Sequence, residues 1–184
     1  MLYTRKGDKG TTKTFGCNQE RISKDSAVPE ALGALDEINS FLGVAKIKAK
    51  QLGFDLGGQK FEKIIHDVQK NLFIIQAELA GASKKIEKNK IIEVEKLVDC
   101  AEKTMPPIKS FSIPGGSELS AVFDCVRAII RRAERRVVTV SKIKTVKINQ
   151  NTLAYLNRLS SLFFAMSRLT NHKSGINEES PDYK

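Results

Sequence analysis

Three arginines recur at four-residue steps in the segment RAIIRRAERR at 127–136. Arg127, Arg131 and Arg135 would share one face of a helix, because residues four apart are neighbours on a helix surface. Like charges at this spacing repel by roughly a few tenths of a kcal/mol per pair, so the stripe needs a compensating anion, either a triphosphate or buried carboxylates. Arginine also forms forked contacts with phosphate oxygens. The stripe predicts a phosphate-binding surface; an exposed basic stripe or structural ion pairs are the alternatives.

A second candidate is the segment YTRKGDKGTTK at 3–13, which combines glycines, hydroxyls and cations. Gly7 and Gly10 would let the backbone approach a ligand, and such a loop suits a polyphosphate. The segment matches neither the Walker pattern nor a dinucleotide-binding glycine fingerprint. Lys24 would extend the same cationic surface. The alternative is a flexible basic arm without a ligand.

Polar residues also recur on two expected helices. Asp36 and Asn39 are three residues apart, so they would be surface neighbours, and Asp36 is a plausible partner for one arginine. Glu37 lies beside them. These residues could equally form the exposed side of an amphipathic helix, and the pair Asn157 and Arg158 is open to the same two interpretations.

Residues for protein-based nucleophilic or acid–base catalysis are scarce. The two histidines have no suggestive neighbours, and the cysteines lie in no reactive motif. Cys17, Cys100 and Cys125 are odd in number and form no CxxC pair. The sequence therefore predicts neither a disulfide framework nor a zinc site.

Length and composition restrict the class of protein. A chain of 184 residues with 41% hydrophobic residues can bury one substantial core, which predicts a single domain. No apolar run approaches the roughly 20 residues of a membrane span, and the first residues lack a signal-peptide core. We therefore expect a soluble, cytoplasmic protein with no membrane partner. The net charge of +10 favours anionic partners without choosing among them.

The elements that must position these residues are five amphipathic helices. Apolar residues recur at three- and four-residue steps, with glycines or prolines between the periodic segments. The segments run over about 29–50, 61–82, 91–103, 117–137 and 151–169. With little strand signal, the pattern predicts an all-α five-helix bundle over 26–172, whose ligand sites come from facing side chains and end loops. Residues 1–25 are expected to be a loop ordered by a ligand, and 173–184 a flexible polar tail.

Several segments together resemble one known family, the PduO-type cobalamin adenosyltransferases. The resemblance runs from about Tyr3 to about Arg168, and the order and spacing of its motifs make it specific. The matching motifs are YTRKGDKGTT, SKD at 23–25, ALDEINSFLG at 34–43, FSIPGGS at 111–117, RRAERRVV at 131–138 and YLNRLSSLFF at 155–164. The chain departs from the family pattern in a longer link GCNQERISK, in Asp124 where histidine is common, and in Ile130 where cysteine is common.

The resemblance implies a homotrimer with the active site between neighbouring subunits. Asp36 and Arg127 would pair across that interface beside the corrinoid, and Phe111 would press on the lower face of the cobalt. Glu134 would hold Mg²⁺ through ATP. The residues that would contact ATP or its magnesium are Thr4, Arg5, Lys6, Gly7, Thr12, Lys13, Lys24, Arg131, Arg132, Ala133, Glu134, Arg135 and Asn157.

The implied activity is transfer of the 5′-deoxyadenosyl group of ATP to cob(I)alamin, which forms adenosylcobalamin and releases triphosphate. The reduced cobalt would itself attack the ribose 5′ carbon, which agrees with the missing protein nucleophile. A reductase and an adenosylcobalamin-dependent client enzyme are implied partners. The competing hypotheses are a non-catalytic basic helical module that binds nucleic acid or ATP, and an idle relative that senses ATP or carries adenosylcobalamin. Few aromatics for base stacking argue against nucleic acid, which we do not expect as a partner.

Overall fold

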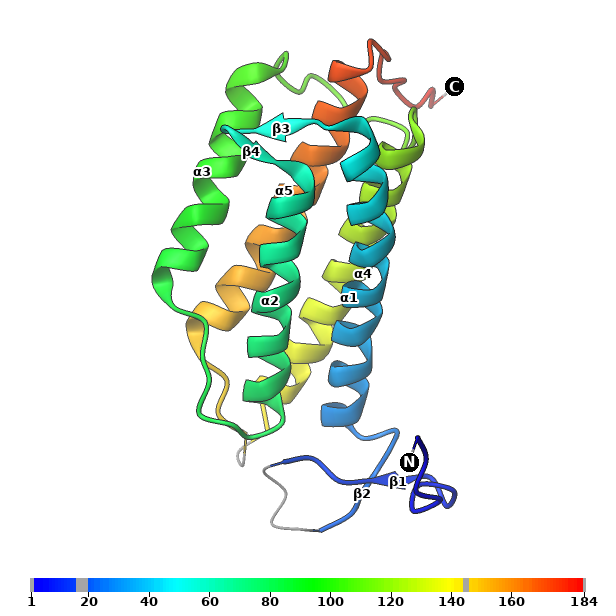
Figure 1. Ribbon diagram of the computed structural model, residues 1–184, viewed down its shortest axis with the longest axis vertical. Helices are drawn as coiled ribbons and strands as arrows, with labels where there is room; N and C mark the ends of the chain where they lie inside the picture. The colour runs from blue at the N-terminus through cyan, green and yellow to red at the C-terminus, as the bar shows by residue number, and fades with distance from the viewer. Residues whose placement is uncertain (1, 16–19, 144–145, 184) are drawn as a thin grey trace.

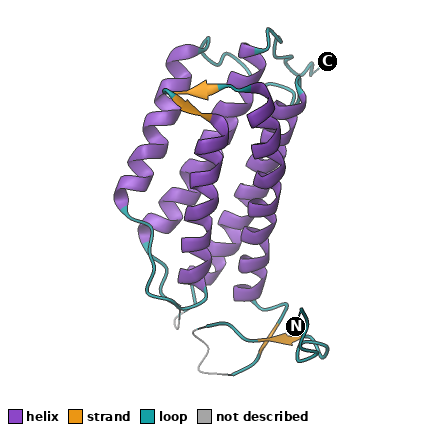
Figure 2. Cartoon of the chain, viewed as in Figure 1, coloured by secondary structure: helices purple, strands orange, loops and turns teal. Residues whose placement is uncertain are grey.

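Five helices run up and down the long axis of the molecule in a bundle (Figures 1 and 2). The computed structural model describes residues 2–15, 20–143 and 146–183. The five predicted helices are confirmed. Their bounds are α1 Ala27–Leu52, α2 Phe61–Leu79, α3 Lys88–Thr104, α4 Glu118–Ser141 and α5 Gln150–Lys173.

Two short antiparallel strand pairs accompany the described helices. They are β1 (Thr11–Thr12) with β2 (Ile22–Ser23), and β3 (Asp55–Leu56) with β4 (Gln59–Lys60). The sequence pattern did not predict either pair. Strands of two residues are too short for a recognisable alternation of apolar and polar side chains, so the expectation of helices joined by plain loops was incomplete.

Local chemistry explains where the helices begin and end. Gly53 ends α1 in the left-handed conformation, at φ 65°, and its N–H donates to the carbonyl oxygen of Ala49. Ser117 and Ser120 form a capping box that starts α4, because each side chain bonds the other residue's backbone N–H. The Asn149 side chain accepts from the N–H of Asn151 and caps α5.

The core lies where the apolar stripes of the helices meet. Side by side, the helices follow the order α2, α1, α4, α5, α3, so α4 is the middle helix, in contact with α1 and α5. Phe123 of α4 lies between Phe61 of α2 and Phe163 of α5, with ring centroids 6.0 and 5.7 Å away. One face of α4 is thereby fixed in the core, which turns its arginines outward.

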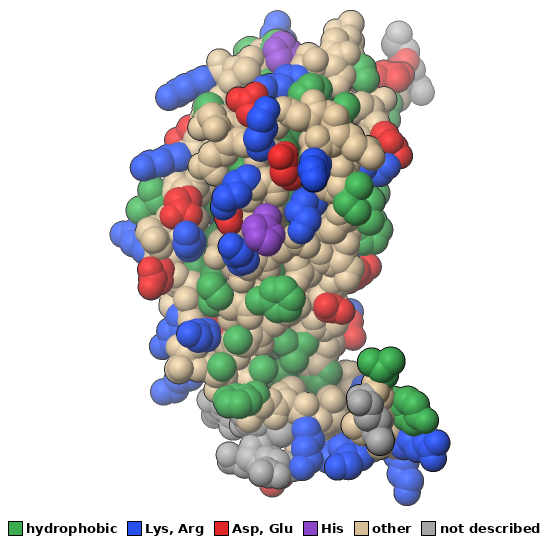
Figure 3. Space-filling model, in the orientation of Figure 1, with side chains coloured by type: hydrophobic (Ala, Val, Ile, Leu, Met, Phe, Trp, Pro, Cys, Tyr) green, Lys and Arg blue, Asp and Glu red, His purple; other side chains and the backbone are tan. Residues whose placement is uncertain are grey.

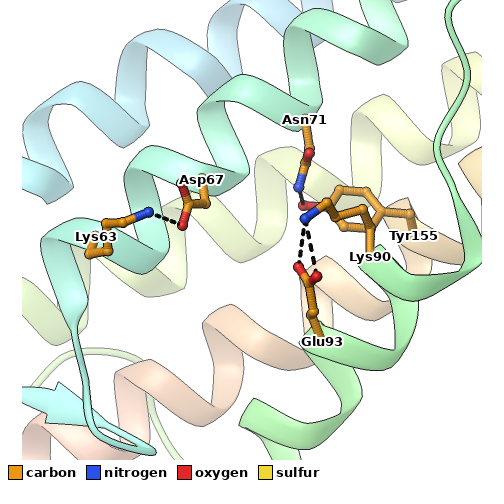
Figure 4. Close-up of polar contacts among 6 residues, drawn as sticks. All are labelled: Lys63, Asp67, Asn71, Lys90, Glu93 and Tyr155. Carbon is orange, nitrogen blue, oxygen red and sulfur yellow. Dashed lines mark hydrogen bonds and ion pairs between the residues drawn. The ribbon is translucent and has the colours of Figure 1, made fainter.

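A hollow of about 490 Å³ separates α2 from α3. At its floor Asn71 Nδ2 donates to the hydroxyl of Tyr155, 2.8 Å away, while the ion pairs Lys63–Asp67 and Lys90–Glu93 lie at its edges (Figure 4). Burial raises the pKa of Tyr155 well above its ordinary value, because the phenolate would lose its hydration. Tyr155 therefore stays neutral and ties α5 to α2.

The two ends of the bundle carry different loops. Residues 2–15 and 20–26, here called the leader, lie beyond the end where α1 starts (Figure 1). The opposite end carries β3, β4, the C-terminal tail at 174–183 and the segment 105–117, here called the Phe111 segment, which joins α3 to α4 (Figure 1). The predicted phosphate-binding and cobalt-facing residues thus belong to different parts of one bundle.

Candidate functional site

The arginines of α4 divide into two groups. Arg132 pairs with Glu37, and Arg136 Nη2 lies 3.2 Å from Glu30 Oε1, so both are neutralised by carboxylates of α1. Arg131 and Arg135 are exposed. Within the described part of the chain neither has a carboxylate partner, and Arg135 Nη1 donates instead to the carbonyl oxygen of Arg131, 3.0 Å away.

For Arg131 and Arg135, this division leaves two of the three alternatives, a phosphate-binding surface and an exposed basic stripe. Structural ion pairs account for Arg132 and Arg136, but not for Arg131 and Arg135. Two neighbouring cations without an anion raise the local potential and favour a multiply charged ligand. The face of α4 that carries Arg131 and Arg135 is therefore the strongest candidate for phosphate binding. Arg132, also predicted to contact ATP, would first have to share or release Glu37.

Glu134 and Asn157 are brought together from two helices. Asn157 Nδ2 donates to Glu134 Oε1 at 2.9 Å, and Asn157 Oδ1 accepts from Arg158 Nη1 at 2.8 Å. Arg158 in turn binds Glu95 of α3 at 2.8 Å. This chain of contacts orients the predicted metal-binding carboxylate of Glu134, the residue that precedes Arg135 in sequence. Ala133, between Arg132 and Glu134 in sequence, is fully buried in the core, so its methyl group packs inside the bundle.

Arg127 lies nearer the N-terminal end of α4 than the other arginines and is half-buried. Its guanidinium carbon lies 6.0 Å from the ring centroid of Phe164, and its Nε is buried without a hydrogen-bond acceptor. Asp36 is exposed on α1, and in the described residues it forms no ion pair with Arg127. The single chain therefore does not bring this predicted pair together, and it leaves a buried donor that still needs a partner.

Hydrogen bonds inside the leader give it a defined shape. Arg21 Nε donates to Thr11 Oγ1 at 2.8 Å and its Nη2 to the Thr11 carbonyl oxygen at 2.6 Å. The N–H of Lys24 donates to the carbonyl oxygen of Gly10 at 2.9 Å, and a Cβ on Gly7 would lie 3.1 Å from Lys24 Nζ. Two predicted ligands, Gly7 and Lys24, are therefore neighbours. Sequence reasoning missed Arg21, which no local motif singles out.

Most of the other predicted ATP ligands in the leader face solvent. Thr4, Arg5, Lys6 and Lys13 are exposed and Thr12 is half-buried, and Lys and Arg side chains gather on the leader in Figure 3. Among the described residues, no hydrogen bond or ion pair joins segment 4–13 to Arg131 or Arg135. Within the described part of one chain, no polar contact therefore joins the two predicted phosphate-binding surfaces.

The Phe111 segment is anchored through its PGG turn. Gly115 N–H donates to Asp124 Oδ2 at 3.0 Å, and its carbonyl oxygen accepts from Asn171 Nδ2 at 2.8 Å. Gly116 has φ 107°, and a Cβ there would lie 2.6 Å from Asn171 Oδ1, so only glycine fits. Asp124 and Asn171 were not predicted as site residues. Their contacts hold the end of the segment next to α4, and Phe111, four residues before Gly115, is 81% exposed.

The described residues of the molecule offer few groups for other kinds of site. In the described residues there is no group of three or more histidine, cysteine or acidic side chains that could hold a metal ion. None of the described helices is both long and apolar enough to cross a membrane. Cys100 and Cys125 are free thiols, and Cys17 lies outside the described residues. A hollow of about 750 Å³ between the leader and the end of α2 is lined by none of the predicted ATP ligands.

Comparisons with known proteins agree with the motifs. The family model described as cobalamin adenosyltransferase matches residues 2–170, so the chain belongs to the cobalamin adenosyltransferase family. It is 36% identical to a corrinoid adenosyltransferase of Bacillus subtilis over 181 residues, covering 96% of this chain and 90% of the relative. It is also 36% identical to the corrinoid adenosyltransferase MMAB of Bos taurus over 183 residues, covering 97% and 74%.

Solved structures show the same fold. A phenylalanine-to-histidine variant of a PduO-type ATP:corrinoid adenosyltransferase from Lactobacillus reuteri, complexed with cobalamin and ATP, superposes with a TM-score of 0.86 at 28% identity, covering 100% of this chain and 97% of that chain. An arginine-to-lysine variant from the same organism, complexed with ATP, has a TM-score of 0.84 at 28% identity and covers 98% and 100%. The resemblance inferred from the motifs is confirmed.

Proposed function

We propose that this chain transfers the 5′-deoxyadenosyl group of ATP to cob(I)alamin. Cobalt(I) supplies an electron pair to the ribose 5′ carbon, a cobalt–carbon bond forms, and the carbon–oxygen bond to the triphosphate breaks. The cobalt becomes cobalt(III), and the leaving oxygen keeps its electron pair as part of the triphosphate. Because the corrinoid substrate is the nucleophile, the protein has to bind, orient and stabilise charge.

The carboxylate-free pair Arg131 and Arg135 carries this proposal. Charge accumulates on the triphosphate as the carbon–oxygen bond breaks, and fixed guanidiniums close to it would stabilise that charge. Family membership supplies the reaction, while the contrast with the paired Arg132 and Arg136 supports the choice of these two side chains. Thr4, Arg5, Lys6, Gly7, Thr12, Lys13 and Lys24 of the leader would complete the triphosphate site.

Mg²⁺ would enter this site with ATP. Magnesium commonly binds through one or two carboxylates together with substrate phosphates, and Glu134 offers one carboxylate whose orientation is held by Asn157. The donor set therefore fits an ion carried mainly by the triphosphate. When bound, Mg²⁺ would neutralise charge on the leaving group.

Phe111, Asp36 and Arg127 would form the corrinoid side. The exposed ring of Phe111 would occupy the lower face of the cobalt and exclude the axial base, which eases reduction before transfer. The buried Nε of Arg127 lacks an acceptor among the described residues of its own chain. A carboxylate such as Asp36 of a neighbouring copy would satisfy it and close the site from the side.

A homotrimer would bring these groups together. Phe41, Val44 and Ile47 recur at three-residue steps on α1 and are 38%, 46% and 64% exposed. Such an exposed apolar stripe on a helix is typical of a contact between chains. It supports the assembly in which the leader of one copy meets α4 of another. The reductase, the client enzyme and the cytoplasmic location stay predictions.

The decisive test combines the protein with magnesium ATP and chemically reduced cobalamin under anaerobic conditions. We expect a light-sensitive alkylcobalamin, followed by its absorbance, and one triphosphate released per product. Samples without ATP and without protein are the controls. If product formation does not exceed those controls, the chain lacks this activity. RNA binding with a steep salt dependence would then support the basic-module hypothesis.

A further inference from the structure

The Phe111 segment has few means of holding its own shape. Residues 106–113 belong to no helix or strand, and most of their side chains are exposed. The PGG turn is anchored through Asp124 and Asn171, but these contacts fix only the end of the segment next to α4. Phe111 therefore depends on other contacts for its position.

The C-terminal tail supplies those contacts. The N–H of Ile113 donates to the carbonyl oxygen of Glu179 at 2.7 Å, and the hydroxyls of Ser110 and Ser180 lie 2.7 Å apart. These two hydrogen bonds flank Phe111 on both sides in sequence. The tail thus runs beside the residues that determine where the ring points. Its flexibility in solution stays a prediction.

Arg168 of α5 fastens the tail to the bundle. Its Nε donates to Glu178 Oε2 at 2.8 Å, and its Nη2 lies 3.4 Å from the carbonyl oxygen of Pro106, where the segment begins. The side chains of Arg168 and Glu178 are only 14% and 24% exposed, the lowest pair of values among the ion pairs of the described residues. Low exposure reduces screening by water, so breaking this pair should matter more than breaking an exposed one.

The same residues line one cavity. A hollow of about 260 Å³ is bounded by Phe111, Phe164, Arg168 and Glu178 together with neighbouring parts of the Phe111 segment. Phe164 is also the ring beside the Arg127 guanidinium. The tail fastening therefore adjoins Phe111 and, through the Phe164 ring, lies near Arg127, two of the three side chains assigned to the corrinoid. Neither Arg168 nor the tail belongs to the triphosphate surface.

We propose that Arg168, Glu178, Glu179 and Ser180 form a clasp that positions Phe111 for the corrinoid step. The clasp residues are positioning residues, because they act on the corrinoid through the Phe111 segment. This inference rests on the proposed function. It predicts that loosening the clasp impairs use of the corrinoid and leaves the KM for ATP unchanged.

Charge reversal across the ion pair tests the clasp in the full-length chain. Arg168→Glu and Glu178→Arg are compared with the double variant that carries both changes. The matched control is Lys173→Glu, which reverses a charge on the same helix that pairs with Asp55 at 3.0 Å, away from the segment. Hydrogen exchange of the Ile113 amide reports on the clasp without any substrate. Steady-state kinetics give kcat/KM for corrinoid and KM for ATP.

Each single reversal should speed Ile113 exchange and lower kcat/KM for corrinoid by about tenfold, as expected for loss of a charged hydrogen bond. The double variant should recover most of both losses, and Lys173→Glu should match the wild type. The clasp would be overturned if Ile113 exchanged at the wild-type rate in the single variants or if the double variant recovered neither loss. It would also be overturned if the KM for ATP rose by the same factor by which kcat/KM for corrinoid fell. A wild-type protein that makes no adenosylcobalamin would instead reject the proposed function, while the exchange data would still test the contact.

Discussion

The two predicted halves of the site are held in opposite ways. The Phe111 segment donates hydrogen bonds to Asp124 of α4 and Glu179 of the tail, and it accepts one from Asn171 of α5. The α4 face with Arg131 and Arg135 has exposed cations that no carboxylate of the described chain neutralises. One half is assembled by the chain itself, whereas the other presents charge that a ligand has to compensate.

This difference predicts that different terms dominate the binding free energy of ATP and of the corrinoid. Cations held close together without an anion repel one another, so triphosphate binding would relieve strain as well as add contacts. A preassembled aromatic contact loses less conformational freedom when the corrinoid binds. Variants of the arginine face should therefore act mainly through charge, and variants of the Phe111 segment mainly through shape.

The largest effect is expected from Arg131→Ala. Loss of one preorganised donor to a developing anion costs about 100- to 1,000-fold in turnover, and ATP binding should weaken as well. Arg136→Ala is the matched control, because it removes the same charge from α4 but breaks only the exposed pair with Glu30. Turnover and ATP affinity measured for both variants separate the two groups of arginines. Equal losses in both would remove the distinction.

Phe111→Ala should abolish most turnover while ATP binding stays at the wild-type level. The side chain is already 81% exposed, so its removal costs little stability. Ile108→Ala, on the same segment, controls for loss of an exposed apolar group. Calorimetric ATP titration and the cobalamin assay are the measurements. Wild-type turnover of Phe111→Ala would disprove the assignment of Phe111 to the cobalt.

Two glycine variants test how the PGG turn of the Phe111 segment is held. Gly115 and Gly116 both have positive φ, but an added Cβ meets Asn171 only at Gly116. Gly116→Ala should lower the free energy of unfolding by about 2–3 kcal/mol and Gly115→Ala by about 1 kcal/mol. Urea unfolding measures both. If the two values coincide, Asn171 does not determine the shape of the turn.

Tyr155→Phe changes the core of the bundle and should not act selectively on the arginine face or on the Phe111 segment. It leaves Asn71 Nδ2 without its acceptor, and we expect a loss of about 1 kcal/mol in unfolding free energy with no selective change in either KM. Because burial raises the folded-state pKa of Tyr155 above 10.0, this residue's contribution to wild-type stability should fall as pH rises above about 10. In Tyr155→Phe, the part of the fall in unfolding free energy with pH that comes from this hydroxyl should be absent. Unfolding curves at pH 8 to 11 provide the comparison.

Apolar spacing was sufficient to predict the five helices, since each stripe repeats over many residues. The two strand pairs were missed because two residues carry no repeat. Sequence could select the arginine segment, but it could not separate Arg131 and Arg135 from Arg132 and Arg136. That distinction depends on Glu30 and Glu37, which the fold brings to α4 from another helix.

The residues that anchor the Phe111 segment could not be predicted from the sequence either, because the fold brings them from other helices. Asn171 lies 54 residues from Ser117, and its bonds to the PGG turn exist only after α4 and α5 have packed. Asp124 was noted only as a departure from the family pattern, whereas it accepts the Gly115 N–H. The PGG sequence indicated a special turn without identifying what holds it. Arg21 in the leader is a similar case.

Subunit mixing tests most directly whether the leader and the α4 arginines of neighbouring copies bind one triphosphate. One chain carries Lys6→Ala with Lys24→Ala, the other Arg131→Ala with Arg135→Ala, and each is inactive alone. In randomly mixed trimers with sites between copies, about one site in four receives both intact surfaces, so activity should return to about a quarter of the wild-type value. Mixed assemblies, verified by native mass spectrometry, that stay as inactive as their parents would contradict the account.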